Sequence, residues 1–434
     1  MAKKSDKTVD KVAQEQEGTP EIPAELQQYL VSEKDHPSIP EHLLEGDERQ
    51  HKSMLMRLLE QRSAKRVLDL PGEDQGLAEH LPFPFMALVG QIEMRTALLL
   101  SVINPNVGGV LLVGPRGTGK TTAARGMSDL LPWIPHSTCM YGCMPEDYEV
   151  EGRQGVCDDC AAKLEAGESI TRMEPVKLIE LPLNARLEDV IGGINERQAI
   201  QHNRVRLDRG ILSRSDRNLL YIDEVNLLED SIVDAILDAS AQGHYTVRRG
   251  PMRATYRSRF VLIGSMNPEE GRLRPQILDR FGLRVLVGGL DEPSDRQRVY
   301  HRMRIFRENP RAFIRTFEDE TYWAREDVMT ARDLISEVTV PEEIINAGLS
   351  LVQGLNIHSS RAEFTMFEAA RALAAADART TVNLDDLRVV APMALRMRRS
   401  EFIENFFASQ QVEDLAIDGL LADLPRKEPS GNGS

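Results

Sequence analysis

Short, largely apolar segments alternate with amphipathic ones through the middle of the chain. Each apolar segment is bounded by polar or glycine-rich residues; they cover residues 110–113, 177–181, 219–222, 260–265 and 284–287. A strand that is covered on both faces has this continuous apolar character. The pattern therefore predicts an α/β fold, in which helices pack on both faces of a parallel sheet.

Apolar residues at helical spacing predict helices between these strands, at residues 89–102, 121–127, 225–241 and 274–282. Beyond Pro293 the pattern is helical only, at residues 294–308, 325–337, 341–353, 360–376 and 384–397. We therefore predict an α/β domain over residues 81–291 and a smaller all-α domain over residues 292–411. Residues 137–172 read as an irregular insertion in the first domain.

The two ends of the chain lack this patterning. Residues 1–80 are rich in Lys, Glu, Asp, Gln and Pro, which predicts a disordered or loosely structured extension, and residues 412–434 predict a flexible acidic tail. A net charge of −15 over 434 residues disfavours nucleic acid as a partner. The sequence has no apolar run of eighteen residues and no signal-peptide core, so we expect a cytoplasmic protein without membrane insertion.

A phosphate-binding loop follows the first predicted strand. It fits the pattern G-x-x-x-x-G-K-[ST] and consists of Gly114, Pro115, Arg116, Gly117, Thr118, Gly119, Lys120 and Thr121. The glycines let the backbone curl so that successive N–H groups face an anion. Lys120 is expected to reach the phosphates, and the Thr121 hydroxyl to bind Mg²⁺. The loop between an apolar strand and a helix indicates ATP, with Mg²⁺, as the ligand.

Two carboxylates and an amide follow later strands. Asp223 and Glu224 come directly after the strand at 219–222, and Asn267 comes just after the strand at 260–265. Ligands collect at the carboxyl ends of parallel strands. We expect Asp223 to hold Mg²⁺ with Thr121, Glu224 to polarise the attacking water, and Asn267 to help orient that water. An alternative role for Asn267 is to form the turn before Pro268.

All four cysteines of the chain lie in the predicted insertion: Cys139, Cys143, Cys157 and Cys160. Two closely spaced pairs of this kind could bind Zn²⁺ tetrahedrally in a reducing compartment. Ordinary or redox-sensitive thiols are the alternative.

Arg280 ends the helix predicted at 274–282. It need not face its own nucleotide, and it is a candidate to stabilise transition-state charge in a neighbouring subunit.

Taken together, the motifs closely resemble the I subunit of magnesium chelatase, an AAA+ ATPase of the branch that includes cobalt chelatase motors and MoxR-type proteins. The resemblance covers roughly residues 82–400. The resemblance rests on Val89-Gly90-Gln91, the phosphate loop, and residues 221–230, 264–271 and 273–282. The cysteine-bearing stretch also resembles an insertion in many members of the family.

The resemblance implies an AAA+ core, a helical lid and a homo-oligomeric ring, a hexamer in this family. By position, Asp223 and Glu224 form Walker B, Asn267 is sensor 1, Arg280 is the arginine finger, and Arg361 is the sensor 2 arginine. The resemblance implies two partners, a D-type subunit with a von Willebrand A (VWA) domain and a large porphyrin-binding H-type subunit. It also implies an ATP-driven motor for Mg²⁺ insertion into protoporphyrin IX, in (bacterio)chlorophyll biosynthesis. The complex would then be a ligase that forms nitrogen–metal bonds.

Two features depart from the family and leave alternatives open. The N-terminal extension is long, and Arg248 stands where the family tends to have an acidic residue. A MoxR-like remodeller that works with a VWA-domain partner on another complex would carry the same nucleotide residues. Other classes are a nucleic-acid motor, which the acidic composition disfavours, and a nucleotide-regulated scaffold, which the intact Lys120 and Glu224 disfavour.

Overall fold

The structure is a computed structural model that describes residues 81–139, 142–193, 209–249, 252–271, 273–399 and 410. The predicted N-terminal extension and acidic tail lie outside these residues. Among the described helices, none is long and apolar enough to cross a membrane.

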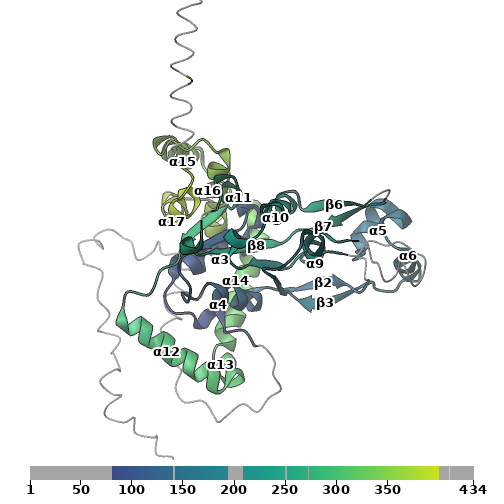
Figure 1. The fold of residues 1–434 in the computed structure, drawn as a ribbon, viewed down its shortest axis with the longest axis horizontal. Helices are drawn as coiled ribbons and strands as arrows, with labels where there is room; N and C mark the ends of the chain where they lie inside the picture. The colour runs from purple at the N-terminus through teal and green to yellow at the C-terminus, as the bar shows by residue number, and fades with distance from the viewer. Residues whose placement is uncertain are drawn as a thin grey trace, which may run out of the picture. The chain divides into compact units, whose positions relative to one another are not determined.

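A five-stranded parallel sheet forms the centre of the described chain (Figure 1). Its strand order is β4 (Leu178–Leu181), β5 (Leu219–Ile222), β8 (Val261–Met266), β1 (Val110–Val113) and β9 (Leu283–Leu286). Every neighbouring pair is parallel. Residues of β1 and β5 are buried throughout, as the apolar runs predicted.

Helices cover both faces of this sheet, and two apolar clusters result. One cluster includes residues of α3 (Ile92–Ile103) and α4 (Lys120–Gly126); the other includes residues of α7 (Leu187–Ile191), α9 (Ile211–Arg214), α10 (Asp230–Gln242) and α11 (Pro275–Arg280). The same part of the chain also contains short 3-10 turns: η3 (Phe85–Ala87), η4 (Pro105–Val107), η5 (Met127–Leu130), η7 (Val225–Leu227) and η8 (Pro268–Glu270).

The helix predicted at 225–241 begins five residues later, at Asp230. Glu224 has a left-handed backbone with φ of 50°, and Leu228 and Glu229 are extended. The chain therefore makes a 3-10 turn and then an extended step before α10 can start.

The regular elements described after β9 are helices, as predicted, apart from one isolated β-bridge between Thr339 and Thr381. They are α12 (Pro293–Glu308), α13 (Pro310–Thr316), α14 (Glu318–Leu334), α15 (Glu342–Gly354), α16 (Ser360–Ala376) and α17 (Leu384–Leu395), with the 3-10 turn η9 (Ile335–Glu337). We call these the C-terminal helices. The prediction missed α13 and started α14 late, at residue 325. Apolar residues of α14 to α17 share one continuous cluster with α3 and the sheet.

The insertion is more ordered than the sequence predicted. Strands β2 (Trp133–Ser137) and β3 (Thr171–Pro175) pair antiparallel and frame α5 (Pro145–Glu151), the 3-10 turn η6 (Gly152–Gly155) and α6 (Asp158–Glu165). A second antiparallel pair, β6 (His244–Arg249) and β7 (Met252–Arg257), carries the exposed Arg248 opposite Arg253. Arg257 of β7 forms an ion pair with Asp147 of α5, so this hairpin contacts the insertion (Figure 1).

Candidate nucleotide-binding site

The phosphate loop connects β1 to α4 at the carboxyl edge of the sheet. Gly114 has no room for a side chain, because an added Cβ would lie 2.0 Å from the Val287 carbonyl oxygen. Gly119 has a φ of +86° and directly precedes α4, a conformation that favours glycine. The buried Lys120 ammonium donates to the carbonyl oxygens of Gly114 and Pro115, at 2.7 Å each. Burial lowers the Lys120 pKa, and the nearby Asp223 carboxylate opposes that shift.

Thr121 and Asp223 are joined through the buried Tyr221. The Tyr221 hydroxyl donates to Asp223 Oδ1 at 3.0 Å and lies 2.9 Å from Thr121 Oγ1. Burial raises the Tyr221 pKa, so the phenol stays protonated and able to donate. Ser265 Oγ of β8 also donates to Asp223 Oδ1, at 2.5 Å. The Thr121 hydroxyl and the Asp223 carboxylate are therefore held in place as two oxygen ligands of the kind that Mg²⁺ prefers.

Glu224 lies beside this chain of hydroxyls. Its backbone N–H donates to Ser265 Oγ at 3.1 Å, so one serine orients both carboxylate residues. The Glu224 carboxylate accepts from Arg116, at 3.1 Å from Nε and 2.9 Å from Nη2. Arg116 also lies 2.6 Å from Glu270. The hydrogen bond to Glu224 raises the Arg116 pKa.

Asn267 follows β8 and is buried. Its side-chain oxygen accepts from the Glu269 N–H at 3.2 Å and caps η8, so its turn-forming role is present. It also lines the same cavity as Lys120, Asp223 and Glu224. Loop residues 116–121 therefore line one cavity with Asp223, Glu224 and Asn267, whereas Gly114 and Pro115 contact the site through the Lys120 ammonium.

The cavity has a volume of about 690 Å³, within the range of small-molecule sites. Its lining combines the polar loop and carboxylates with apolar residues: Phe83, Leu88, Val89, Met94, Leu290, Val299 and Met303. Gln91, Arg296 and Arg302 also line it. The arrangement suits a ligand with a charged end and a flat apolar end, as a nucleoside triphosphate has.

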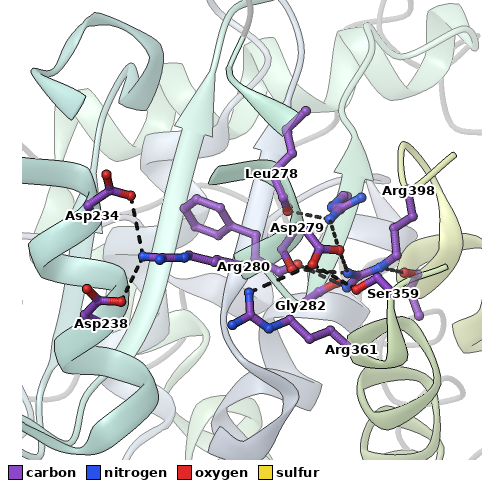
Figure 2. Close-up of polar contacts among 12 residues, drawn as sticks. Asp234, Asp238, Leu278, Asp279, Arg280, Gly282, Ser359, Arg361 and Arg398 are labelled. Carbon is purple, nitrogen blue, oxygen red and sulfur yellow. Dashed lines mark hydrogen bonds and ion pairs between the residues drawn. The ribbon is translucent and has the colours of Figure 1, made fainter. Parts of the chain in front are cut away.

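Arg280 lies elsewhere, with two aspartates of its own chain (Figure 2). Its Nη1 is 2.9 Å from Asp238 Oδ1 and 3.4 Å from Asp234 Oδ1, both on α10. The Arg280 side chain is 31% exposed, so this ion pair is open to solvent.

Arg361 comes from the first turn of α16 and lies 3.9 Å from Asp279, the residue before Arg280 (Figure 2). Asp279 is held more tightly by two other groups. Ser359 Oγ donates to its Oδ2 at 2.8 Å, and Arg398 Nη1 donates to its Oδ1 at 2.7 Å. Arg398 also donates to the carbonyl oxygens of Phe281 and Gly282, at 3.2 and 3.0 Å.

The two arginines and the phosphate loop lie at opposite edges of the sheet. Arg280 and Arg361 line a second cavity with Gly108 and Asn218, residues that precede β1 and β5. The first cavity is lined by residues at or beyond the carboxyl ends of the same strands. Among the described residues, the two cavities share no lining residue.

Comparisons with known proteins match two parts of the chain, one in the α/β core and one in the C-terminal helices. The sequence profile of the family "Magnesium chelatase, subunit ChlI" matches residues 196–285, and that of "AAA lid domain" matches residues 350–415. A magnesium-chelatase subunit ChlI homolog of Methanocaldococcus jannaschii is 43% identical over 323 residues, covering 74% of this chain and 87% of that protein. The chain belongs to the magnesium chelatase subunit ChlI family.

Two further similarities complete the comparison. The magnesium-chelatase 38 kDa subunit of Acidiphilium rubrum is 39% identical, covering 76% of this chain and 95% of that protein. A solved structure of a complex between subunits BchI and BchD of magnesium chelatase matches with 35% identity and a TM-score of 0.42, over 75% of this chain and 99% of that chain.

This ChlI-family chain has an AAA+ α/β core followed by a helical lid, which confirms the predicted fold class. The domain boundaries at residues 291 and 411 stay predictions. The family makes ATP and Mg²⁺ the expected ligands of the 690 Å³ cavity.

Sequence reasoning missed several residues of the site. Tyr221 stands two residues before Asp223 on β5, and Ser265 two residues before Asn267 on β8. Side chains two apart share a face of a strand, so this spacing was the available signal. Val299 and Met303 of α12 line the nucleotide cavity, although this helix was predicted only as part of the second domain.

The four cysteines of this ChlI-family chain gather in the insertion. Their sulfur atoms all lie within 4.8 Å of one another. Cys139 Sγ is 3.8 Å from Cys143 Sγ and 3.6 Å from Cys157 Sγ. None of the four, all of them described, forms a disulfide.

Proposed function

We propose that the chain is the ATP-hydrolysing motor of a magnesium chelatase, and that it works in a hexameric ring. Its hydrolysis would drive Mg²⁺ insertion into protoporphyrin IX by a separate catalytic subunit, in (bacterio)chlorophyll biosynthesis. The observation that carries the motor assignment is the division of the candidate catalytic groups between the two edges of one sheet.

The carboxyl edge would bind ATP and activate water. Lys120 would exchange its two carbonyl partners for phosphate oxygens. Mg²⁺ bound with ATP would be held by Thr121 and Asp223 and would neutralise phosphate charge. Glu224 would accept a hydrogen bond from the attacking water, with Asn267 as a second contact, once its carboxylate leaves Arg116.

The amino edge would act on the nucleotide of the next subunit. A four-residue strand such as β1 spans about 13 Å at the usual rise per residue. Arg280 and Arg361 therefore cannot be expected to reach the phosphates of their own chain. In a ring built by head-to-tail contacts, this edge of one subunit faces the cavity of its neighbour, where both arginines would stabilise the transition-state charge.

Two partners would complete the proposed complex. A VWA-domain D-type subunit would dock on the ring, and a large H-type subunit would bind the porphyrin. Both partners are proposed from the resemblance to the magnesium chelatase family.

A subunit-mixing experiment tests the proposed split site. Glu224→Gln is expected to lower ATP turnover by about 10²- to 10⁴-fold while ATP binding remains. Arg280→Ala is expected to lower turnover by about 10³-fold or more. A 1:1 mixture should recover up to about a quarter of wild-type activity, because random assembly pairs an intact Glu224 with an intact Arg280 at that share of interfaces.

The control mixes Glu224→Gln with the Glu224→Gln/Arg280→Ala double variant, which leaves every interface without the carboxylate and should stay inactive. No recovery in the first mixture, when the subunits demonstrably assemble together, would place Arg280 outside the neighbour's site. The chelatase assignment has its own test, ATP-dependent Mg²⁺ insertion into protoporphyrin IX with D- and H-type subunits added. If the chain hydrolyses ATP but supports no Mg²⁺ insertion in that assay, the motor assignment would stand and the chelatase assignment would be wrong.

A further inference from the structure

The cysteine cluster lies outside the nucleotide cavity and has no part in the proposed hydrolysis. From its geometry we infer that Cys139, Cys143, Cys157 and Cys160 together bind one structural Zn²⁺ ion. A tetrahedral zinc site has Zn–S bonds of about 2.3 Å, so its sulfur atoms lie about 3.8 Å apart. The separations of 3.8 Å from Cys139 to Cys143 and 3.6 Å from Cys139 to Cys157 match that figure.

The backbone holds the sulfur atoms in this arrangement from two sides. Between Cys139 and Cys143, Gly142 has a left-handed φ of +70°, and its N–H donates to the Cys139 carbonyl at 3.0 Å, which closes a tight turn. Cys157 directly precedes α6 and Cys160 lies in its first turn, so both sulfurs leave the same end of one helix. The Cys157 N–H donates to Cys143 Sγ at 3.3 Å, which joins the two pairs.

The insertion buries too few apolar side chains to fold by the hydrophobic effect alone. Its cluster of buried residues consists of Cys143, Cys160 and Ile170, with Val156 and Leu164 partly buried beside them. None of the described residues of α5 is buried. Segments of fewer than about 40 residues usually need a metal or disulfides to hold a fold, and here two of the three central side chains are thiols.

The donor set excludes the hard cations. Four soft sulfur ligands suit Zn²⁺, whereas Mg²⁺ and Ca²⁺ require oxygen. The site is therefore distinct from the Mg²⁺ that accompanies ATP and from the Mg²⁺ delivered to the porphyrin. Binding exchanges the four thiol protons for one divalent cation, with no change of oxidation state.

A bound ion would fix the insertion against the β6–β7 hairpin. The Arg257–Asp147 pair already joins this hairpin to α5, and Arg217 Nη2 lies 3.2 Å from Glu146 on the same helix. Gly142 packs directly on Arg209, because a Cβ there would lie 2.2 Å from its Nη1. Arg209 in turn donates to Ser213 Oγ of α9 at 2.6 Å. The turn of the first cysteine pair is thus connected to the core.

The first measurement is the metal content of the full-length protein, purified without added metal and analysed by mass spectrometry of the elements. We expect about one Zn²⁺ per chain. Because these are all the cysteines of the chain, four equivalents of a mercurial reagent should release that zinc completely. Co²⁺ exchanged into the site should give thiolate charge-transfer absorption and the strong visible bands of a tetrahedral ion.

Cys157→Ser should lower zinc content at least about tenfold, while ATP binding stays unchanged because no cysteine lines the nucleotide cavity. Matched controls are His136→Gln, three residues before Cys139, and Asp158→Asn, beside Cys157; both should keep the zinc. If Cys157→Ser does not fold, the wild-type measurements still decide. Two disulfides found by intact mass, or four free thiols that added Zn²⁺ does not protect from alkylation, would overturn the inference.

Discussion

The two edges of the sheet hold their charged groups in opposite ways. At the carboxyl edge, Lys120 is buried and bonded to backbone carbonyls, and Asp223 is held by two hydroxyls. At the amino edge, Arg280 and Arg361 are 31% and 55% exposed, and their ion-pair partners among the described residues are carboxylates. The first edge is therefore prepared to receive a ligand, while the second holds cations that can move to another partner.

This difference has an energetic meaning. An ion pair as exposed as Arg280 with Asp238 contributes about 0–1 kcal/mol, so exchanging it for a neighbour's phosphate costs little. Disturbing the hydroxyls around Asp223 costs more, because buried polar groups would lose their partners. On the proposed function, the subunit is rigid where it binds nucleotide and adaptable where it meets its neighbour.

Among the residues that support the predicted site at the rigid edge, Tyr221→Phe is expected to have the largest effect. This change removes the one hydroxyl that contacts both Thr121 and Asp223, while the aromatic ring stays in place. Loss of such a group behind metal ligands typically weakens metal affinity about 10- to 100-fold. We expect the Mg²⁺ concentration needed for half-maximal ATPase activity to rise by that factor. Tyr300→Phe on the exposed face of α12 is the control. An unchanged Mg²⁺ requirement would mean that this edge is less rigid than its hydrogen bonds indicate.

The sequence predicted the rigid edge better than the adaptable one, for a physical reason. The strands β1 and β5 are buried on both faces and so are apolar throughout, and the phosphate loop needs particular residues in consecutive positions. Signals of this kind are local. Tyr221 was missed although its spacing from Asp223 was visible, because a tyrosine in an apolar run reads as core.

The amino edge depends on contacts between distant residues. Arg398 lies 119 residues from Asp279, its ion-pair partner, and nothing near Arg398 in sequence indicates that partner. Arg280 was a candidate from its place at the end of a predicted helix, and Arg361 was identified only by the resemblance to a family. Neither pattern nor spacing placed Arg361 beside Asp279. The helices of the insertion escaped prediction for a related reason: α5 buries none of its described residues, so it has no apolar period to detect.

Arg398→Met tests whether the adaptable edge rests on a fixed support. Its side chain is fully buried and joins the end of the C-terminal helices to the segment that carries Arg280. Its removal leaves buried acceptors without a donor, so we expect a loss of about 2 kcal/mol in the free energy of unfolding, measured with urea. We also expect kcat for ATP to fall while ATP binding is kept, because only the position of Arg280 changes.

Arg388→Met is the matched control for that variant, since Arg388 is an exposed arginine on α17 with a surface partner, Asp385. It should alter stability by less than about 0.5 kcal/mol. If Arg398→Met lowered stability but left kcat unchanged, Arg280 would be positioned independently of the C-terminal helices.

The smallest expected effect concerns an exposed ion pair of the rigid edge, Arg116 with Glu224. Arg116 is 69% exposed and donates to Glu224 Oε1, so on the proposed function it competes with the attacking water for that carboxylate. Because an ion pair this exposed is weak, Arg116→Ala should raise kcat only modestly, by up to about fivefold. High salt should reduce the difference between variant and wild type, because salt screens exposed pairs. Arg125→Ala, which removes a similar exposed pair with Glu180, should leave kcat unchanged. A fall in kcat would instead indicate that Arg116 binds phosphate. The carboxyl edge would then also hold an exposed cation that exchanges partners, as the amino edge does.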